Sequence, residues 1–329
     1  SEAMLYRAGA IRKLGRVDHK DAFLDTDTLE KARGITIFSK QALLTAGNTD
    51  ITLLDTPGHV DFSTETERTL QVLDYAVLVV SGTDGVQSHT ETLWRLLRRY
   101  HVPTFVFVNK MDLPGKSREE LLAQLNHRLG EGFVAFDVPQ ADRDEALALC
   151  DENLMDRMLD AGQLTDADLI PAVARRHVFP CWFGSALRRT ENDALESVDA
   201  LLDGIDRYTR PAPALDAFGA KVFKVSQDEQ GTRLTWLRVT GGELKVKAQL
   251  SGEADGEPWE EKANQLRLYS GVKYTLAEAI GPGQVCAVTG LTKARPGEGL
   301  GAERDSDVPV LEPVLSYQVL LPEGADVHA

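Results

Sequence analysis

The sequence is poor in cysteine and contains no long apolar run. Its three cysteines, Cys150, Cys181 and Cys286, lie far apart and show no spacing typical of metal ligands. Because three thiols cannot all pair with one another, this content favours a reducing compartment. No apolar stretch reaches the length of a transmembrane helix, and the printed residues contain no signal-peptide pattern. We therefore expect a cytoplasmic protein with no membrane partner.

Basic residues are also scarce, since 36 Lys and Arg face 51 Asp and Glu and the formal net charge is −15. Indiscriminate nucleic-acid binding depends on neutralising phosphates, so this charge argues against it and we expect no DNA partner. A local docking face on an RNA-containing partner remains open. Residues 217–310 hold 12 basic and 13 acidic residues, so the acidic excess lies mainly in the first part. The pairs Arg98-Arg99 and Arg175-Arg176 are expected on solvated helix faces.

The first part of the chain alternates strand-like and helix-like segments. Near-continuous apolar runs predict buried strands at Ala76–Val80, Thr104–Val108 and Val178–Phe183. Strands of this kind are covered by helices on both faces, which predicts an α/β domain over residues 1–208 with a mostly parallel sheet. The aromatic residues of these strands are expected in the core: Phe105, Phe107, Trp182 and Phe183.

The pattern changes after residue 208. Residues 209–216 include Pro211-Ala212-Pro213-Ala214 and have the composition of a linker. Residues 217–310 show short strands separated by glycine-rich turns, which predicts a small antiparallel β-barrel domain. Residues 311–329 have the pattern of the first strand of a third domain. The strands expected in the barrel are Lys221–Val225, Arg233–Val239, Leu244–Leu250, Lys262–Leu268 and Gln284–Thr289.

A candidate site begins where the apolar run Ile51–Leu54 ends in Asp55-Thr56-Pro57-Gly58-His59. This pattern predicts a buried strand that delivers a carboxylate to the edge of an α/β sheet where ligands bind. Asp55 could hold Mg2+, and Gly58 could bring a backbone N–H against a phosphate because no side chain is in the way. His59 would then lie beside the phosphorus. The alternative is a strand followed by a turn that carries a surface histidine.

A second candidate site is Asn109-Lys110-Met111-Asp112, which follows the strand Thr104–Val108. The Asp112 carboxylate can accept from the ring N–H and the exocyclic amine of guanine, whereas adenine would leave it unpaired. Asn109 can tie the loop together and reach the purine edge, while the Lys110 stem lies along the base. The turn Ser185-Ala186-Leu187 follows the next buried strand; its alternative reading is a helix N-cap at Ser185.

In this order, the motifs resemble those of the translational GTPases over essentially the whole chain. Residues 238–244 and 281–291 are similar to the barrel domain of elongation factor G and its relatives. Leu5–Ile11, continuing through Leu14–Asp18, resembles the tetracycline-resistance ribosomal protection proteins, and the short stretch between Asp112 and Ser185 favours the same branch. The other matching segments are Arg33–Ile37 as first switch, Asp55–His59 as second switch, Asn109–Asp112 as base-specificity loop and Ser185–Leu187 as last guanine contact.

The resemblance implies hydrolysis of GTP to GDP with Mg2+, on the ribosome, by a monomeric factor. It implies that Thr36 and Asp55 bind Mg2+, that the Gly58 amide senses the γ-phosphate and that His59 orients the attacking water. Ile35 would belong to an apolar gate. The residues implied to bind GTP are Thr36, Asp55, Gly58, Asn109, Lys110, Asp112, Ser185, Ala186 and Leu187.

The sequence departs from this family at one point. It contains no Gly-x-x-x-x-Gly-Lys followed by Ser or Thr, the loop that cradles the phosphates. We therefore expect the chain as given to bind nucleotide poorly and to be an internal fragment of a larger factor. A domain that dispenses with the loop is the alternative. For function, two alternatives stay open: a translocation factor of the elongation factor G type and a nucleotide-free ribosome-binding module.

Overall fold

The structure is a computed structural model that describes residues 1–15, 23–24, 36–187, 195–254 and 256–311. Its first part is built on a parallel sheet of four strands in the order β3-β4-β6-β5. The predicted α/β class with a parallel sheet is therefore confirmed. At one edge of the sheet, β3 exposes 57% of Val79. The four strands are β3 (Ala76–Ser81), β4 (Thr104–Asn109), β6 (Phe179–Phe183) and β5 (Phe133–Ala135).

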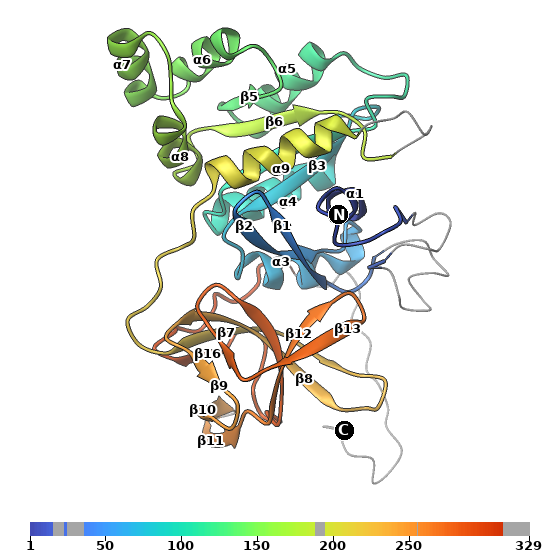
Figure 1. The fold of residues 1–329 in the computed structure, drawn as a ribbon, viewed down its shortest axis with the longest axis vertical. Helices are drawn as coiled ribbons and strands as arrows, with labels where there is room; N and C mark the ends of the chain where they lie inside the picture. Colours follow the sequence, from blue (N-terminus) through green and yellow to red (C-terminus); the bar gives the residue numbers. More distant parts are fainter. Residues whose placement is uncertain (16–22, 25–35, 188–194, 255, 312–329) are drawn as a thin grey trace.

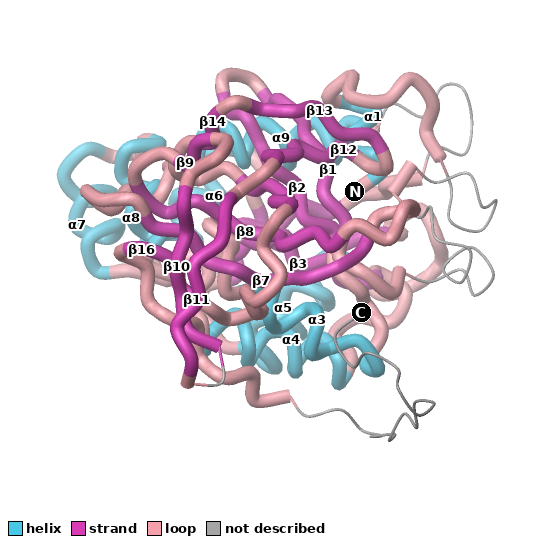
Figure 2. The backbone as a smooth tube through the Cα atoms, turned by 90° about the horizontal axis from the view of Figure 1, so that it is seen from below, coloured by secondary structure: helices cyan, strands magenta, loops and turns pink. Residues whose placement is uncertain are grey.

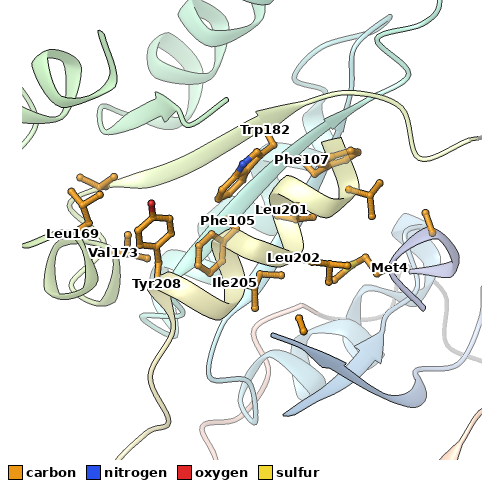
Figure 3. Close-up of a cluster of buried hydrophobic side chains, with 14 of the residues drawn as sticks. Met4, Phe105, Phe107, Leu169, Val173, Trp182, Leu201, Leu202, Ile205 and Tyr208 are labelled. Carbon is orange, nitrogen blue, oxygen red and sulfur yellow. The ribbon is translucent and has the colours of Figure 1, made fainter. Parts of the chain in front are cut away.

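Helices cover both faces of this sheet, because successive side chains of a strand point to opposite faces. Phe105 and Phe107 of β4 pack on one face with α9 (Glu196–Tyr208), together with Trp182; Figure 3 shows this cluster. Val106 and its neighbours on the other face pack against α4 (Ser88–Arg99) and α5 (Arg118–Leu129). The predicted core positions of the aromatic residues are confirmed, since none exposes more than 9%.

The sequence predicted Arg176 on a solvated helix face, and this prediction is wrong. Its guanidinium lies 4.8 Å from the ring centre of Trp94 and 5.1 Å from that of Phe179, and it donates to Thr104 Oγ1 at 3.1 Å. Burial lowers the pKa of Arg176 to about 10. The aliphatic stem and planar head of arginine pack on aromatic rings, so Arg176 covers Trp94 and Phe179 at the edge of the hydrophobic core.

The strand that ends at Asp55 differs from its prediction. It is β2 (Thr49–Asp55), half-buried, and it pairs antiparallel with β1 (Lys40–Ala46) through a turn in which Gly47 has φ 56°. Within the described residues it does not join the parallel sheet. Its apolar side chains face two different environments. Ile51 and Leu53 contact the α9 core, whereas Leu54 contacts the second part of the molecule.

The remaining helices surround the sheet, as Figure 1 shows. The first of them ends before Gly9, which has a left-handed φ of 73°. None of the described helices has both the length and the apolar character needed to cross a membrane. These elements are α1 (Glu2–Arg7), the 3₁₀ turn Val60–Phe62, α3 (Ser63–Leu70), α6 (Gln140–Ala148), α7 (Glu152–Ala161) and α8 (Asp166–Ala174).

The second part is antiparallel, as predicted, with a six-stranded sheet in the order β13-β12-β15-β8-β7-β16 and two strand pairs, β10-β11 and β14-β9. The single strand expected over Leu244–Leu250 is broken, because Lys247 has a left-handed φ of 65°. The strands are β7 (Gly219–Gln227), β8 (Arg233–Gly241), β9 (Leu244–Lys245), β10 (Gln249–Ala254), β11 (Glu257–Lys262), β12 (Gln265–Ser270), β13 (Lys273–Ala277), β14 (Ala279–Ile280), β15 (Val285–Thr289) and β16 (Gly299–Gly301).

The two parts are in direct contact. Figure 2 views the molecule from below, from the side of the second part. Arg238 on β8 binds Asp74 at 2.5 Å and donates to the Val72 oxygen at 3.0 Å. The Gln41 side chain on β1 donates to the Val285 oxygen at 3.2 Å. A cavity of about 730 Å³ remains between the β1-β2 hairpin, residues 72–75 and residues 282–285.

Candidate functional site

The first candidate segment starts at Asp55, the last residue of β2. The hydroxyl of Ser1, the N-cap residue of α1, donates a hydrogen bond to the Asp55 carboxylate. This contact brings the beginning of the described chain to the end of β2, although 54 residues separate them. The N-terminal end of α1 and the Asp55 carboxylate therefore lie together.

The residues after Asp55 form a turn that is fixed on one side and open on the other. Pro57 is buried, and its carbonyl accepts from the Thr66 hydroxyl at 2.9 Å. Gly58 is exposed, and a Cβ added there would meet nothing within 4 Å. The Gly58 backbone is therefore accessible to a ligand, as the sequence argument requires.

His59 is half-exposed, with 52% of its side chain accessible, and its Nδ1 lies 3.2 Å from Oδ2 of Asp61. The Asp61 backbone N–H approaches the same nitrogen at 3.4 Å. A proton on Nδ1 satisfies the shorter contact with the carboxylate and makes Nε2 the hydrogen-bond acceptor of the ring. Asp61 was not predicted as a site residue. The only signal for it in the sequence is its position two residues after His59, and the 3₁₀ turn Val60–Phe62 then brings it to the ring.

The expected first-switch residues are only partly covered. Thr36 is described and half-buried, whereas Ile35, predicted for the apolar gate, lies outside the described residues. Three residues after Thr36, the Ser39 hydroxyl lies 3.0 Å from that of Thr69 on α3. The end of this segment is thus attached to the helix that follows His59.

The residues predicted to read the base come together from two strands. The Asn109 side-chain oxygen accepts from the backbone N–H of Lys110 and from that of Ala186, each at 2.9 Å. The Met111 N–H donates to the Gly184 oxygen at 3.1 Å. Asn109 therefore ties the two loops together, as predicted from its position at the end of β4. Lys110 adopts a left-handed φ of 66°, which the bonded asparagine side chain holds in place.

Helix α9 does not begin at the turn after β6. The Leu187 N–H donates to Ser185 Oγ at 3.3 Å, so the serine closes its own turn. Helix α9 begins later, with Leu195 as its N-cap residue. The N-cap alternative for Ser185 is therefore wrong for α9, and the residues of this turn stay beside Asn109.

A third loop, after β3, supports the base-reading loop and was not predicted. The Gly82 N–H donates to the Asn109 oxygen at 2.7 Å, and a Cβ at Gly82 would lie 2.7 Å from the Met111 sulfur. Hydrogen bonds from Ser81, and next from Thr83, lower the pKa of Asp84 in the same loop. The signal in the sequence was the Gly-Thr-Asp-Gly turn directly after an apolar strand.

The described residues contain no group of three or more His, Cys, Asp or Glu side chains arranged to hold a metal. Mg2+ is commonly bound by one or two carboxylates together with substrate phosphates, so Asp55 beside an open backbone turn fits this cation. The donor set does not fit a metal held by protein ligands alone.

We compared the chain with protein families and with known proteins. Residues 1–211 match the family model described as the elongation factor Tu GTP binding domain. The chain is 34% identical over 346 residues to the tetracycline resistance protein TetM of Streptomyces lividans, covering 97% of this chain and 53% of that protein. It is 27% identical over 398 residues to elongation factor G 2 of Syntrophus aciditrophicus, covering 99% and 58%.

A solved structure from Thermus thermophilus is also similar, with a TM-score of 0.75 and 25% identity, covering 98% of this chain and 54% of that one. The chain thus spans about half the length of the curated relatives it matches. The alignment with the elongation factor is 398 positions long and that with TetM 346, against 329 residues in the chain. The elongation factor therefore carries more inserted residues relative to this chain.

Proposed function

The chain belongs to the family of the elongation factor Tu GTP binding domain, and on this premise we propose that it is part of a ribosome-dependent GTPase of the ribosomal protection type. We propose residues 1–208 as the GTP-binding domain, 209–216 as a linker, 217–310 as the β-barrel domain and 311–329 as the start of a third domain. The partner is the ribosome, and the factor acts as a cytoplasmic monomer.

The observation that carries the proposal is the joining of two loops by Asn109. The hydrogen bond to Ala186 brings Asp112 and the Ser185–Leu187 turn to one edge of the sheet. Asp112 accepts from the two donors that guanine presents and adenine lacks, so the site selects the base. Backbone N–H groups of the turn contact the guanine carbonyl, while the Lys110 stem covers the ring.

The phosphate end of the proposed site is built from Asp55, Gly58 and His59. Asp55 and Thr36 would hold Mg2+, which neutralises charge on the phosphates when bound. The Gly58 N–H donates to the γ-phosphate, and His59, held by Asp61, orients the attacking water. The water oxygen bonds to the γ-phosphorus as the bond to the bridging oxygen of GDP breaks, which releases phosphate. Ile35 contributes to the apolar gate beside the water.

A translocation factor of the elongation factor G type is the second candidate, because the similarity to elongation factor G 2 extends over 99% of the chain. The shorter alignment with TetM favours the protection type, because TetM carries fewer inserted residues relative to this chain than the elongation factor does. The two candidates share their chemistry and differ in what hydrolysis does on the ribosome. Ribosomes stalled by tetracycline distinguish them, because only a protection factor restores peptide synthesis there.

The proposal is tested by titrating fluorescent GDP in Mg2+ with this chain and with the same chain extended upstream through a phosphate-binding loop. We expect tight binding only by the extended chain, with competition by GDP and not by ADP. Equal competition by ADP would refute the guanine site. Tight binding by the chain as given would refute the need for the loop, and absence of binding by both would favour the nucleotide-free ribosome-binding module.

A further inference from the structure

Helix α3, which follows His59, contains a carboxylate with no exposed surface, that of Glu67. Both of its oxygens accept hydrogen bonds. The Tyr100 hydroxyl and the Val310 N–H donate to Oε1 at 2.6 and 2.8 Å, and the Leu311 N–H donates to Oε2 at 2.9 Å. Glu67 thus binds the backbone of a segment more than 240 residues away, which follows the second part of the chain.

A buried carboxylate is strongly unfavourable unless its lone pairs are used, so these three donors are required where Glu67 lies. Burial, followed by the hydrogen bond to Glu67, raises the pKa of Tyr100 to about 12. Tyr100 therefore remains a protonated donor throughout the neutral range. The remaining two donors both come from the same short piece of backbone, whose position determines whether Glu67 is satisfied.

Two further side chains of the same helix bind this piece, defined here as the exit segment, residues 307–311. The Thr64 hydroxyl donates to the Leu311 oxygen at 3.2 Å, and the Gln71 amide donates to the Asp307 oxygen at 3.1 Å. Thr64, Glu67 and Gln71 are three and four residues apart and so share one helix face. The exit segment lies along that face.

Apolar packing of the exit segment comes from Leu311, which lies against the hydrophobic cluster that contains Leu70 and Leu97. Val308 exposes 82% of its surface and Val310 exposes 48%, so backbone hydrogen bonds to α3 supply the rest of the attachment. Its start is fixed to the second part, because the Ser306 N–H donates to the Gly297 oxygen at 2.7 Å. The segment therefore joins the β domain directly to the helix behind the candidate phosphate site.

Another side of α3 is also held by the second part. Lys224 on β7 lies 3.4 Å from Glu65 and donates to the Ser39 oxygen at 2.6 Å. Only 10% of the Lys224 side chain is exposed. Helix α3 thus contacts β7 on one side and the exit segment on another, so a movement of α3 must shift or break the contacts on both sides.

We propose that Glu67 is a latch that holds the exit segment on α3, so that displacement of α3 also displaces residues 307–311. The attachment of the exit segment to Glu67 does not depend on any bound nucleotide. Its control by nucleotide rests on the proposed function, since α3 moves only if the turn at Gly58 and His59 responds to the γ-phosphate.

The latch is tested by hydrogen–deuterium exchange of the Val310 and Leu311 amides in the parent and in Glu67→Gln. Glutamine retains one acceptor but turns an NH₂ donor toward the backbone donors, so we expect exchange at these amides to rise at least about tenfold. Glu65→Gln, the same change on the Lys224 side of α3, is the matched control and should leave them unchanged. Equal protection in parent and Glu67→Gln would overturn the latch.

A second variant, Val310→Pro, tests the same contact in case Glu67→Gln unfolds the domain. Val310→Pro removes one donor at a half-exposed position, and we expect the Leu311 amide to lose protection while α4 and β4 amides keep theirs. Unchanged Leu311 exchange would overturn the proposal. For the nucleotide arm, the extended chain is compared with GDP and with a non-hydrolysable GTP analogue. Equal Leu311 exchange in two states shown to bind overturns the coupling, whereas absence of binding refutes the proposed function alone.

Discussion

The side-chain oxygen of Asn109 lies 2.9 Å from the backbone nitrogen of Ala186, although the two residues are 77 positions apart. One end of this hydrogen bond is the last residue of β4 and the other lies just after β6, and the two strands are paired in parallel. Neighbouring parallel strands bring their carboxyl ends to one edge, so the contact is a direct result of the sheet order.

Asn109→Ala leaves the N–H groups of Lys110 and Ala186 without their shared acceptor. We expect GDP affinity to fall about tenfold, which corresponds to ~1.4 kcal/mol for one net hydrogen bond and the looser loops. Fluorescent-GDP titration of the extended chain measures the change. Asn153→Ala, at the start of α7 and away from the site, is the control, and an equal effect of both changes would contradict this role of Asn109.

Asp112→Asn should change which base is bound. The amide offers one acceptor and one donor, so it cannot accept from both donors of guanine, but it pairs with a base that has a carbonyl in place of the exocyclic amine. We expect GDP binding to weaken about 100-fold and xanthosine diphosphate to become the better competitor. Unchanged preference for GDP would mean that another residue reads the base.

His59→Ala should retain nucleotide affinity and lose ribosome-stimulated hydrolysis by about 10²–10⁴-fold, the usual contribution of a positioned acid or base group. Asp61→Asn should give a smaller loss, because the ring stays but its tautomer and orientation are no longer held. Single-turnover hydrolysis with and without ribosomes separates the two variants. Equal stimulated rates in the parent and His59→Ala would remove His59 from the mechanism.

His89, in the first turn of α4, makes stability depend on pH. Both of its ring nitrogens are buried without a hydrogen-bond partner among the described residues, and burial, followed by repulsion from His59, lowers its pKa below the ordinary 6.5. The unfolded chain then binds the proton more tightly than the folded one, so stability falls as the pH drops below about 6.5. In His89→Gln this loss should be smaller. Urea unfolding at about pH 7 and about pH 5, on either side of the ordinary histidine pKa, measures it. Parallel pH dependence in both proteins would exclude His89 as its source.

The sequence predicted the elements whose pattern is local and strong. Continuous apolar runs identified β3, β4 and β6, and polar residues directly after them identified the loop at Asn109. The features that the sequence did not predict depend on contacts between segments far apart in the chain. The β2 strand pairs with β1 instead of the parallel sheet, and Arg176 is covered by Trp94, which no local pattern reveals. Asp61 was missed because a carboxylate in a turn looks like an ordinary surface residue until its distance to His59 is known.

The position of β3 at the edge of the sheet has a consequence for handling the protein. In the described part of the chain β3 pairs only with β4, its six residues carry no charge, and Val79 is 57% exposed. Natural sheets protect such edges with charges, proline or a covering segment, because an open edge accepts a strand from another molecule. We therefore expect concentrated solutions of this chain to self-associate through β3, and Val79→Lys to reduce the association measured by light scattering.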